Sequence, residues 1–306
     1  MTSPSRPNPL MRKLLAKPRV ADRAAALADV RNRSVTARVV RRAARFPERP
    51  IPMFWFKGFP NLGDALSPVI VEYMSNGTPL YVSGRGRGKL LAAGSVLHKL
   101  TEGDSVWGTG ALRDVPMTPP PGVKIYAVRG PLTRGLLKAD VPEIYGDPAM
   151  LLPRFYTPRS EKRFEVGVLP HHVDRQFVQV TDPSISTIDV SAEWRIVVDQ
   201  IAECQTILSS SLHGLIVAEA YGIPAVWMSV TDKVVGEGFK FRDYYLSTGR
   251  EAPTPLRWDG ALSVMDRRLA APPWVDMGPL LRAWPKELTF PPFGVKLTQD
   301  VESHPR

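Results

Sequence analysis

The stretch that decides the fold runs from Thr206 to Met228 and reads TILSSSLHGLIVAEAYGIPAVWM. Its first residues are β-branched and aliphatic, which predicts a buried strand, and its later apolar residues recur at helical spacing. The helix is expected to span Leu212 to Tyr221, because Gly222 suits a left-handed C-cap and Pro224 cannot continue a helix. The stretch therefore predicts a strand, a polar turn, a helix and a second strand.

The polar turn of this stretch carries residues suited to chemistry. Ser210, Ser211 and Leu212 lie at the start of the helix, where backbone N–H groups lack partners and favour an anion. His213 follows in the first turn, and an imidazole titrates near neutral pH. Ligands of open α/β sheets bind at the carboxyl ends of strands, so the turn predicts a functional site. Serines are also ordinary N-caps, and this purely structural interpretation stays open on the residues alone.

Strands and helices alternate on both sides of the turn. This alternation predicts an α/β protein with two Rossmann-like parallel-sheet domains that face each other across a cleft. The expected divisions are a basic N-terminal arm (1–50), an N-terminal α/β domain (51–153), a C-terminal α/β domain (163–250), and C-terminal helices and a tail (251–306). Residues 153–162 are polar and rich in proline, which is typical of a linker.

The single cysteine, Cys204, is expected in an apolar helix beside Ile201 and Ala202. One thiol forms neither a disulfide framework nor a zinc site, so the expected compartment is the reducing cytoplasm. No apolar run has the length of a membrane span, and the N-terminus lacks the apolar core of a signal peptide.

The positive charge of the chain belongs to its N-terminal arm. Residues 1–50 hold 13 Lys or Arg and only 3 Asp or Glu, so the formal net charge of +10 lies there and the remainder is neutral. Peripheral contact with an anionic membrane, on the inner face of the cytoplasmic membrane, is one interpretation, at about 1 kcal/mol per basic residue. A solvated extension is the other, and an organellar transit peptide has a similar composition. No nucleic-acid partner is expected, because aromatic residues do not alternate with the basic ones.

Six motifs occur in the order found in one known family. Besides SLHGLI and the AEAYGIP that follows it, these are NLGD at 61–64, GSVLH at 94–98, VRGP at 128–131, YGDP at 145–148, and FKFRDYY with TGR between 239 and 250. Together they resemble the polysaccharide pyruvyl transferases, in particular the exopolysaccharide ketal-pyruvate transferases of the xanthan and succinoglycan type. The resemblance implies a fold similar to the two-domain GT-B glycosyltransferases. It also implies transfer of pyruvate from phosphoenolpyruvate to a terminal sugar of a lipid-linked oligosaccharide, which forms a cyclic ketal and releases phosphate, with no cofactor and no metal.

Site residues follow from the motifs. His213 is the expected proton-transfer group, while Arg129 and the N–H groups after Ser210 and Ser211 are expected to hold the anionic groups of the donor. Weaker candidates for the acceptor or the cleft are Asn61, Asp64, Asp147, His171, Lys240 and Tyr244. The wider family has arginine where this chain has Ser211, so Arg129, Lys240 or Arg242 is expected to supply the missing cation.

Two further segments allow more than one interpretation. Residues 84–89, GRGRGK, suggest a phosphate-binding loop, but the spacing is wrong and no Ser or Thr follows Lys89, so a flexible basic turn is predicted. The segment Phe239–Arg250 suits stacking on a sugar ring, or it is a loop that packs its tyrosines on the core.

Two other functions remain open on the sequence. One is a nucleotide-sugar glycosyltransferase of the same architecture, in which the helix N-terminus binds a pyrophosphate. The other is a non-catalytic scaffold of polysaccharide assembly at the membrane surface. The sequence does not identify the acceptor sugar.

Overall fold

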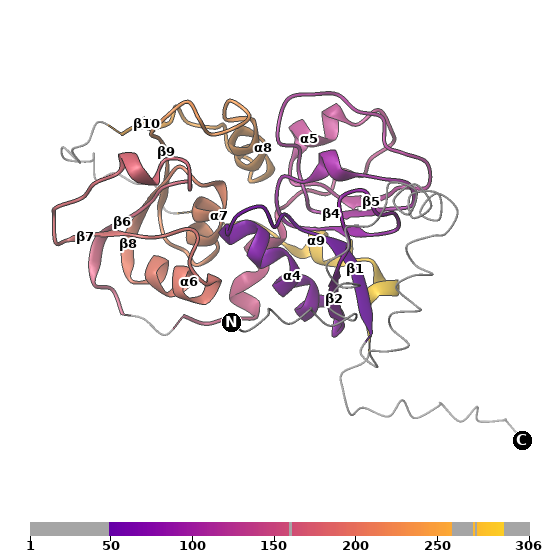
Figure 1. Ribbon diagram of the computed structural model, residues 1–306, viewed down its shortest axis with the longest axis horizontal. Helices are drawn as coiled ribbons and strands as arrows, with labels where there is room; N and C mark the ends of the chain where they lie inside the picture. The colour runs from indigo at the N-terminus through magenta and orange to yellow at the C-terminus, as the bar shows by residue number, and fades with distance from the viewer. Residues whose placement is uncertain (1–48, 159–160, 259–271, 273, 291–306) are drawn as a thin grey trace, which may run out of the picture.

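The computed structural model describes residues 49–158, 161–258, 272 and 274–290. Two parallel sheets form the cores of two lobes, which Figure 1 shows side by side. The predicted α/β architecture with two Rossmann-like sheets is therefore confirmed. The basic arm and the helical patch expected near 261–269 lie outside the described residues. Within the described residues, no helix is both long and apolar enough to span a membrane.

The first sheet has the strand order β2-β1-β3-β4-β5, with all neighbouring strands parallel. Its strands are β1 (Pro50–Phe54), β2 (Thr78–Tyr81), β3 (Leu90–Leu91), β4 (Ser105–Trp107) and β5 (Lys124–Ala127). The helices of this half are α4 (Leu62–Ser75), η1 (Leu97–Lys99), α5 (Pro131–Leu136) and η2 (Pro148–Arg154).

The second sheet has the order β10-β9-β8-β6-β7 and is also parallel throughout. Its strands are β6 (Phe164–Leu169), β7 (Ile185–Thr187), β8 (Cys204–Ser209), β9 (Ala225–Ser229) and β10 (Leu256–Arg257). The helices of this half are η3 (Arg175–Phe177), α6 (Trp194–Ala202), α7 (Leu212–Ala220) and α8 (Phe239–Ser247).

Both sheets share one topology. When the strands of each half are counted from its first strand, each sheet has the doubly wound order 2-1-3-4-5. In this order the strand sequence reverses between the first and third strands, and ligands bind outside the carboxyl ends at that reversal. The relevant strand pairs are β1 with β3 and β6 with β8, so the loops that follow these four strands define where to look for a site.

Strand β3 pairs only at Leu90 and Leu91, and Gly94 beyond it adopts a positive φ of 103° that turns the chain away. Two local expectations are corrected. Cys204 opens strand β8 instead of lying in a helix, because α6 ends at Ala202. The segment Phe239–Arg250 is mostly the helix α8, in which Tyr244 and Tyr245 are buried.

The C-terminal part of the described chain returns to the first lobe, where it is yellow in Figure 1. Helix α9 (Gly278–Arg282) covers Trp107, whose indole Nε1 donates to the carbonyl of Leu280 at 2.9 Å. Trp284 packs edge-on against the same indole, with ring centroids 4.7 Å apart. A short helix, η4 (Lys286–Leu288), follows. The last described segment thus completes the core of the first half.

Candidate active site

The loops at the two topological reversals meet in one cavity between the halves. Its volume is about 310 Å³. The β1 loop and the start of α4 contribute Phe56, Phe59, Asn61 and Asp64; the segment after β3 contributes Gly94, Ser95, Val96, His98 and Lys99; the β6 loop contributes His171, His172 and Val173; the turn after β8 contributes Ser211, Leu212 and His213; and Leu112, Lys233, Val235 and Lys240 complete the lining. Besides His213, the cavity is therefore lined by six of the site residues that the sequence predicts.

His213 is the imidazole at the first turn of α7, and a buried carboxylate lies behind it. Its Nε2 is 3.3 Å from Oδ2 of Asp147, which is fully buried. Neither of these two atoms has a hydrogen bond within the described part of the chain. The other carboxylate oxygen of Asp147 accepts from the N–H of Ala149 at the start of η2. A carboxylate at this position favours the tautomer with the proton on Nε2, so Nδ1 is the nitrogen able to exchange a proton.

Gly63 lets α4 approach the imidazole. A Cβ at this position would lie 2.0 Å from Nδ1 of His213, far inside van der Waals contact. The NLGD motif of the first half and the SLHG motif of the second half, 150 residues apart in sequence, therefore meet at one ring. Any side chain larger than hydrogen at Gly63 would move the imidazole.

The start of α7 differs in detail from the prediction. The N–H of Ser211 donates to Oγ of Ser209 at 3.0 Å, and the N–H of Ser210 donates to the carbonyl of Leu169 at 3.3 Å. The N–H groups of Leu212 and His213 have no hydrogen bond within the described residues. An anion at this helix end would therefore meet Leu212 and His213, while Ser211 contributes its side chain to the cavity lining.

Asp174 is a site-adjacent residue that the sequence did not indicate. It is fully buried, and its carboxylate accepts from the hydroxyls of Ser210 at 2.7 Å and Thr231 at 2.5 Å. Ser210 in turn accepts from the N–H of His171 at 2.8 Å. Because the hydroxyl of Ser210 is engaged in both directions, it fixes the β6 loop against the β8 turn and does not line the cavity.

Lys240 brings a buried positive charge to the cavity from α8. It is 9% exposed, and it forms no salt bridge within the described residues. Burial and the nearby charge of Arg129 lower the pKa of its ammonium to about 8, although Asp64 and Asp174 act in the opposite direction. A cation without an adjacent carboxylate in a nearly dry cavity is suited to an anionic ligand.

Two other titratable groups face the same space. Asp64 accepts from the side-chain amide of Asn61 at 2.8 Å, and burial raises the pKa of its carboxyl above the ordinary value. Burial, with Lys240 and His172 nearby, lowers the pKa of His171 to about 3, so its ring is neutral at physiological pH. The cavity thus holds the buried ammonium of Lys240, a carboxyl that resists ionisation and the neutral ring of His171, and Lys99 and Lys233 line it as well.

Besides Ser210, three predicted residues do not line this cavity. Arg129 is fully buried and donates to Asp243 at 3.0 Å, to Ser95 at 2.6 Å and to the carbonyl of Ala111 at 2.7 Å. The hydroxyl of Tyr244 donates to Glu219 at 2.6 Å. Asp147 lies beneath His213, as described above. Each is committed to contacts inside the protein, so the cations that line the cavity are Lys99, Lys233 and Lys240, of which Lys240 is the buried one.

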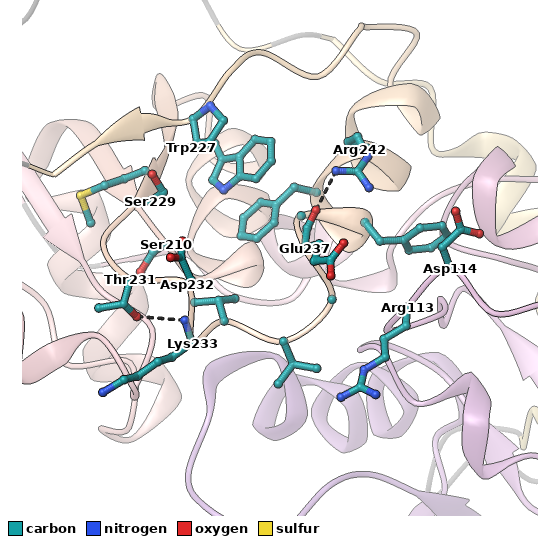
Figure 2. Close-up of a pocket in the computed structure, with 18 of the residues that line it drawn as sticks. Arg113, Asp114, Ser210, Trp227, Ser229, Thr231, Asp232, Lys233, Glu237 and Arg242 are labelled. Atoms are coloured by element: carbon teal, nitrogen blue, oxygen red, sulfur yellow. Dashed lines mark hydrogen bonds between the residues drawn. The ribbon is translucent and has the colours of Figure 1, made fainter.

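A larger groove of about 980 Å³ adjoins the cavity beyond Lys233 and Val235, which line both. Figure 2 shows its labelled side chains, which come from the carboxyl ends of β8 and β9, the loop that leads into α8, and the loop around Arg113 of the first half. Three cations and three carboxylates line it: Arg113, Lys233, Arg242, Asp114, Asp232 and Glu237. Arg242 donates to the carbonyl of Glu237, as the dashed line shows. This balanced, polar lining is suited to a neutral ligand such as a glycan.

Comparison with known proteins confirms the family resemblance over the centre of the chain. Residues 122–232 match the family model described as polysaccharide pyruvyl transferase, a segment that includes Asp147, His171 and His213. The chain is 29% identical over 216 residues to the succinoglycan biosynthesis protein ExoV of Rhizobium meliloti (strain 1021), covering 65% of each chain. It is 34% identical over 139 residues to the uncharacterized protein L143 of Acanthamoeba polyphaga mimivirus, covering 41% of this chain and 48% of that protein.

The matched regions thus span about half to two thirds of the length of these relatives. No solved structure matches the chain. The likeness to the GT-B glycosyltransferases, which the family resemblance implies, therefore stays a prediction.

Proposed function

We propose that this protein transfers pyruvate from phosphoenolpyruvate to a terminal sugar of a lipid-linked exopolysaccharide repeat unit. The match to the polysaccharide pyruvyl transferase family and the similarity to a succinoglycan biosynthesis protein support a transferase of this class. The observation that carries the proposal is one cavity with two groups in its lining. Lys240 is a buried cation without a salt-bridge partner in the described residues, and His213 lies in the first turn of α7.

The reaction makes two C–O bonds at C2 of the donor. One sugar hydroxyl adds to C2, and C3 gains a proton to become a methyl group. A second hydroxyl of the same sugar then bonds to C2 as the bond to the phosphate oxygen breaks. The proton lost by the first hydroxyl balances the proton gained at C3, and the proton of the second hydroxyl leaves with phosphate. The protein must therefore hold two anionic groups and move protons on either side of C2.

The cavity offers groups for both tasks. Lys240 and the N–H groups of Leu212 and His213 bind the carboxylate and phosphate of the donor, as a cation and a helix N-terminus favour anions. His213, whose Nε2 lies 3.3 Å from the carboxylate of Asp147, exchanges the proton through Nδ1. Asp64, whose carboxyl has a raised pKa, is the second proton-transfer group and the one able to orient a sugar hydroxyl. A cavity of about 310 Å³ suits a donor of this size.

The acceptor reaches the donor from outside the cavity. The polar groove of Figure 2 is continuous with the cavity through Lys233 and Val235 and is large enough for several sugar units. In this proposal the basic arm of residues 1–50 brings the enzyme to the inner face of the cytoplasmic membrane, where a lipid-linked acceptor is anchored.

The test is phosphate release from phosphoenolpyruvate, measured with and without a lipid-linked oligosaccharide extract, for the native protein and for His213→Ala. The expected result is release that depends on the extract and falls by about 10²-fold or more in the variant, the loss typical of a missing acid–base group. Labelling C3 of the donor adds a product test, because the label must appear as a methyl group on the glycan.

Two outcomes favour the alternatives. Turnover of a nucleotide sugar without any release from phosphoenolpyruvate would identify a glycosyltransferase. Activity that is unchanged in His213→Ala would remove the imidazole from the chemistry. Circular dichroism of the variant is the control that separates lost chemistry from lost folding.

A further inference from the structure

A second groove opens onto the same cavity from the first half of the chain. It has a volume of about 700 Å³ and is called the basic groove below. Its lining comes from β1 and its loop, from the turn after β2, and from η1: Phe54, Phe56, Lys57, Gly58, Tyr81, Ser83, Gly84, Arg85, His98, Lys99 and Leu100. Phe56, His98 and Lys99 line the cavity as well, so the two spaces adjoin at these side chains.

The charge of the basic groove is of one sign. Lys57, Arg85 and Lys99 line it, and no Asp or Glu is among its described lining residues. Within the described chain none of these three cations forms a salt bridge. The ammonium of Lys57 lies over the ring of Tyr81, 4.1 Å from its centroid. The groove of Figure 2, by contrast, has equal numbers of cations and carboxylates.

The turn that carries Arg85 is fixed by a buried ion pair. The Lys89 ammonium pairs with Asp104, and both side chains are fully buried. The same ammonium donates to the carbonyl of Gly86 at 2.7 Å and to the hydroxyl of Thr101 at 2.8 Å. The glycine-rich segment 84–89 is therefore a braced turn instead of the flexible one predicted. Burying a charge without a partner costs free energy, so the Lys89–Asp104 pair must stay intact and keeps the turn in one conformation.

In the proposed function, Lys240 binds the donor in the cavity, so the basic groove is available for the acceptor. We infer that the basic groove binds an anionic group of the glycan acceptor, a phosphate or a sugar carboxylate, close to the sugar that reacts. Arg85 and Lys99 bind the anionic oxygens, and the rings of Tyr81 and Phe56 contact the apolar face of a neighbouring sugar. This inference rests on the proposed function, because it assigns the acceptor side of the same site.

The kinetic test removes one charge at a time. Arg85→Gln and Lys99→Gln are expected to raise the apparent KM for a lipid-linked oligosaccharide extract by about fivefold each, the effect of a charge-assisted contact at a partly exposed site. In Arg85→Gln the KM for phosphoenolpyruvate and the rate at saturating acceptor should change by less than about twofold, because Arg85 does not line the donor cavity, whereas Lys99 lines both spaces. Arg87→Gln is the matched control, because Arg87 belongs to the same turn but is paired with Glu102 at 2.6 Å and does not line the groove.

A binding test decides the inference even if the protein does not turn over phosphoenolpyruvate. Calorimetric titration with sodium pyrophosphate and with sodium glucuronate is carried out on the full-length protein carrying Lys240→Met, which removes the buried ammonium that α8 brings to the donor cavity. Binding that weakens at least about fivefold on adding Arg85→Gln, but not Arg87→Gln, supports the basic groove as an anion site, because Arg85 lines that groove and not the donor cavity. Tighter pyrophosphate binding identifies a phosphate, and tighter glucuronate binding identifies an acidic sugar. No binding of either probe, or equal binding in all variants, overturns the inference.

Discussion

The contact between Gly63 and His213 gives the sharpest prediction about the active site. A Cβ at residue 63 would lie 2.0 Å from Nδ1 of His213, whereas ordinary contact begins near 3.4 Å. In Gly63→Ala the imidazole must therefore move by about 1.4 Å, because the backbone of α4 is held by its helix and its buried face. Misplacing a catalytic group by about 1 Å costs on the order of 10² in rate. We expect kcat for phosphate release to fall by about 100-fold.

The stability of the same variant separates this effect from unfolding. Alanine within a helix is favoured over glycine by about 0.5–1 kcal/mol, and local repacking costs about 1–3 kcal/mol, so the net change in unfolding free energy is small. Thermal unfolding followed by circular dichroism measures it. Gly135→Ala is the matched control, because Gly135 is also helical and a Cβ there meets nothing within 4 Å. Native turnover in Gly63→Ala would refute the idea that the reaction needs His213 in its observed position.

Further predictions concern three charged groups. The Lys240 pKa of about 8 lies below its ordinary 10.5, so the KM for phosphoenolpyruvate should rise as pH increases above 8. Between pH 8 and 10.5 the unfolded chain binds more protons at this residue, so its contribution to stability rises with pH; Lys240→Met should abolish that slope in urea titrations. Asp147→Asn keeps an acceptor for the N–H of Ala149 but removes the charge beside His213, and kcat should fall by about 10²-fold with unchanged circular dichroism. Asp243→Ala leaves Arg129 buried without its carboxylate and should lower the unfolding free energy by about 3–5 kcal/mol in the same urea assay.

The sequence predicts the parts of this site that follow from topology. A strand that ends in small or polar residues before a helix must present those residues at the carboxyl edge of its sheet. This rule holds for His213 after β8, for His171 after β6 and for Asn61 after β1, and the structure brings all three to one cavity. The rule applies to each half of the chain separately, so it does not depend on how the two halves contact each other.

The predicted residues that lie outside the cavity are held there by contacts between distant segments. Arg129 also follows a strand, but its guanidinium is neutralised by Asp243, 114 residues later, and nothing in the local sequence indicates that pair. Asp147 resembles a cleft residue because its motif ends a strand-like run, yet it lies beneath His213. Helix α8 was missed because its buried residues come from most of its sides, so its sequence has no clear apolar stripe.

Helix α8 links the position of Lys240 to the contact between the two halves. On the side of the second half, Phe241 stacks on Trp227 with ring centroids 4.6 Å apart. On the side of the first half, Asp243 accepts from Arg129 and from both the N–H and the hydroxyl of Thr133, and Figure 1 shows α8 beside α5. Lys240 lies one helical turn before Asp243, so the bonds that hold the carboxylate also fix the direction of the ammonium. The position of the Lys240 ammonium therefore depends on contacts that α8 makes with both halves of the chain.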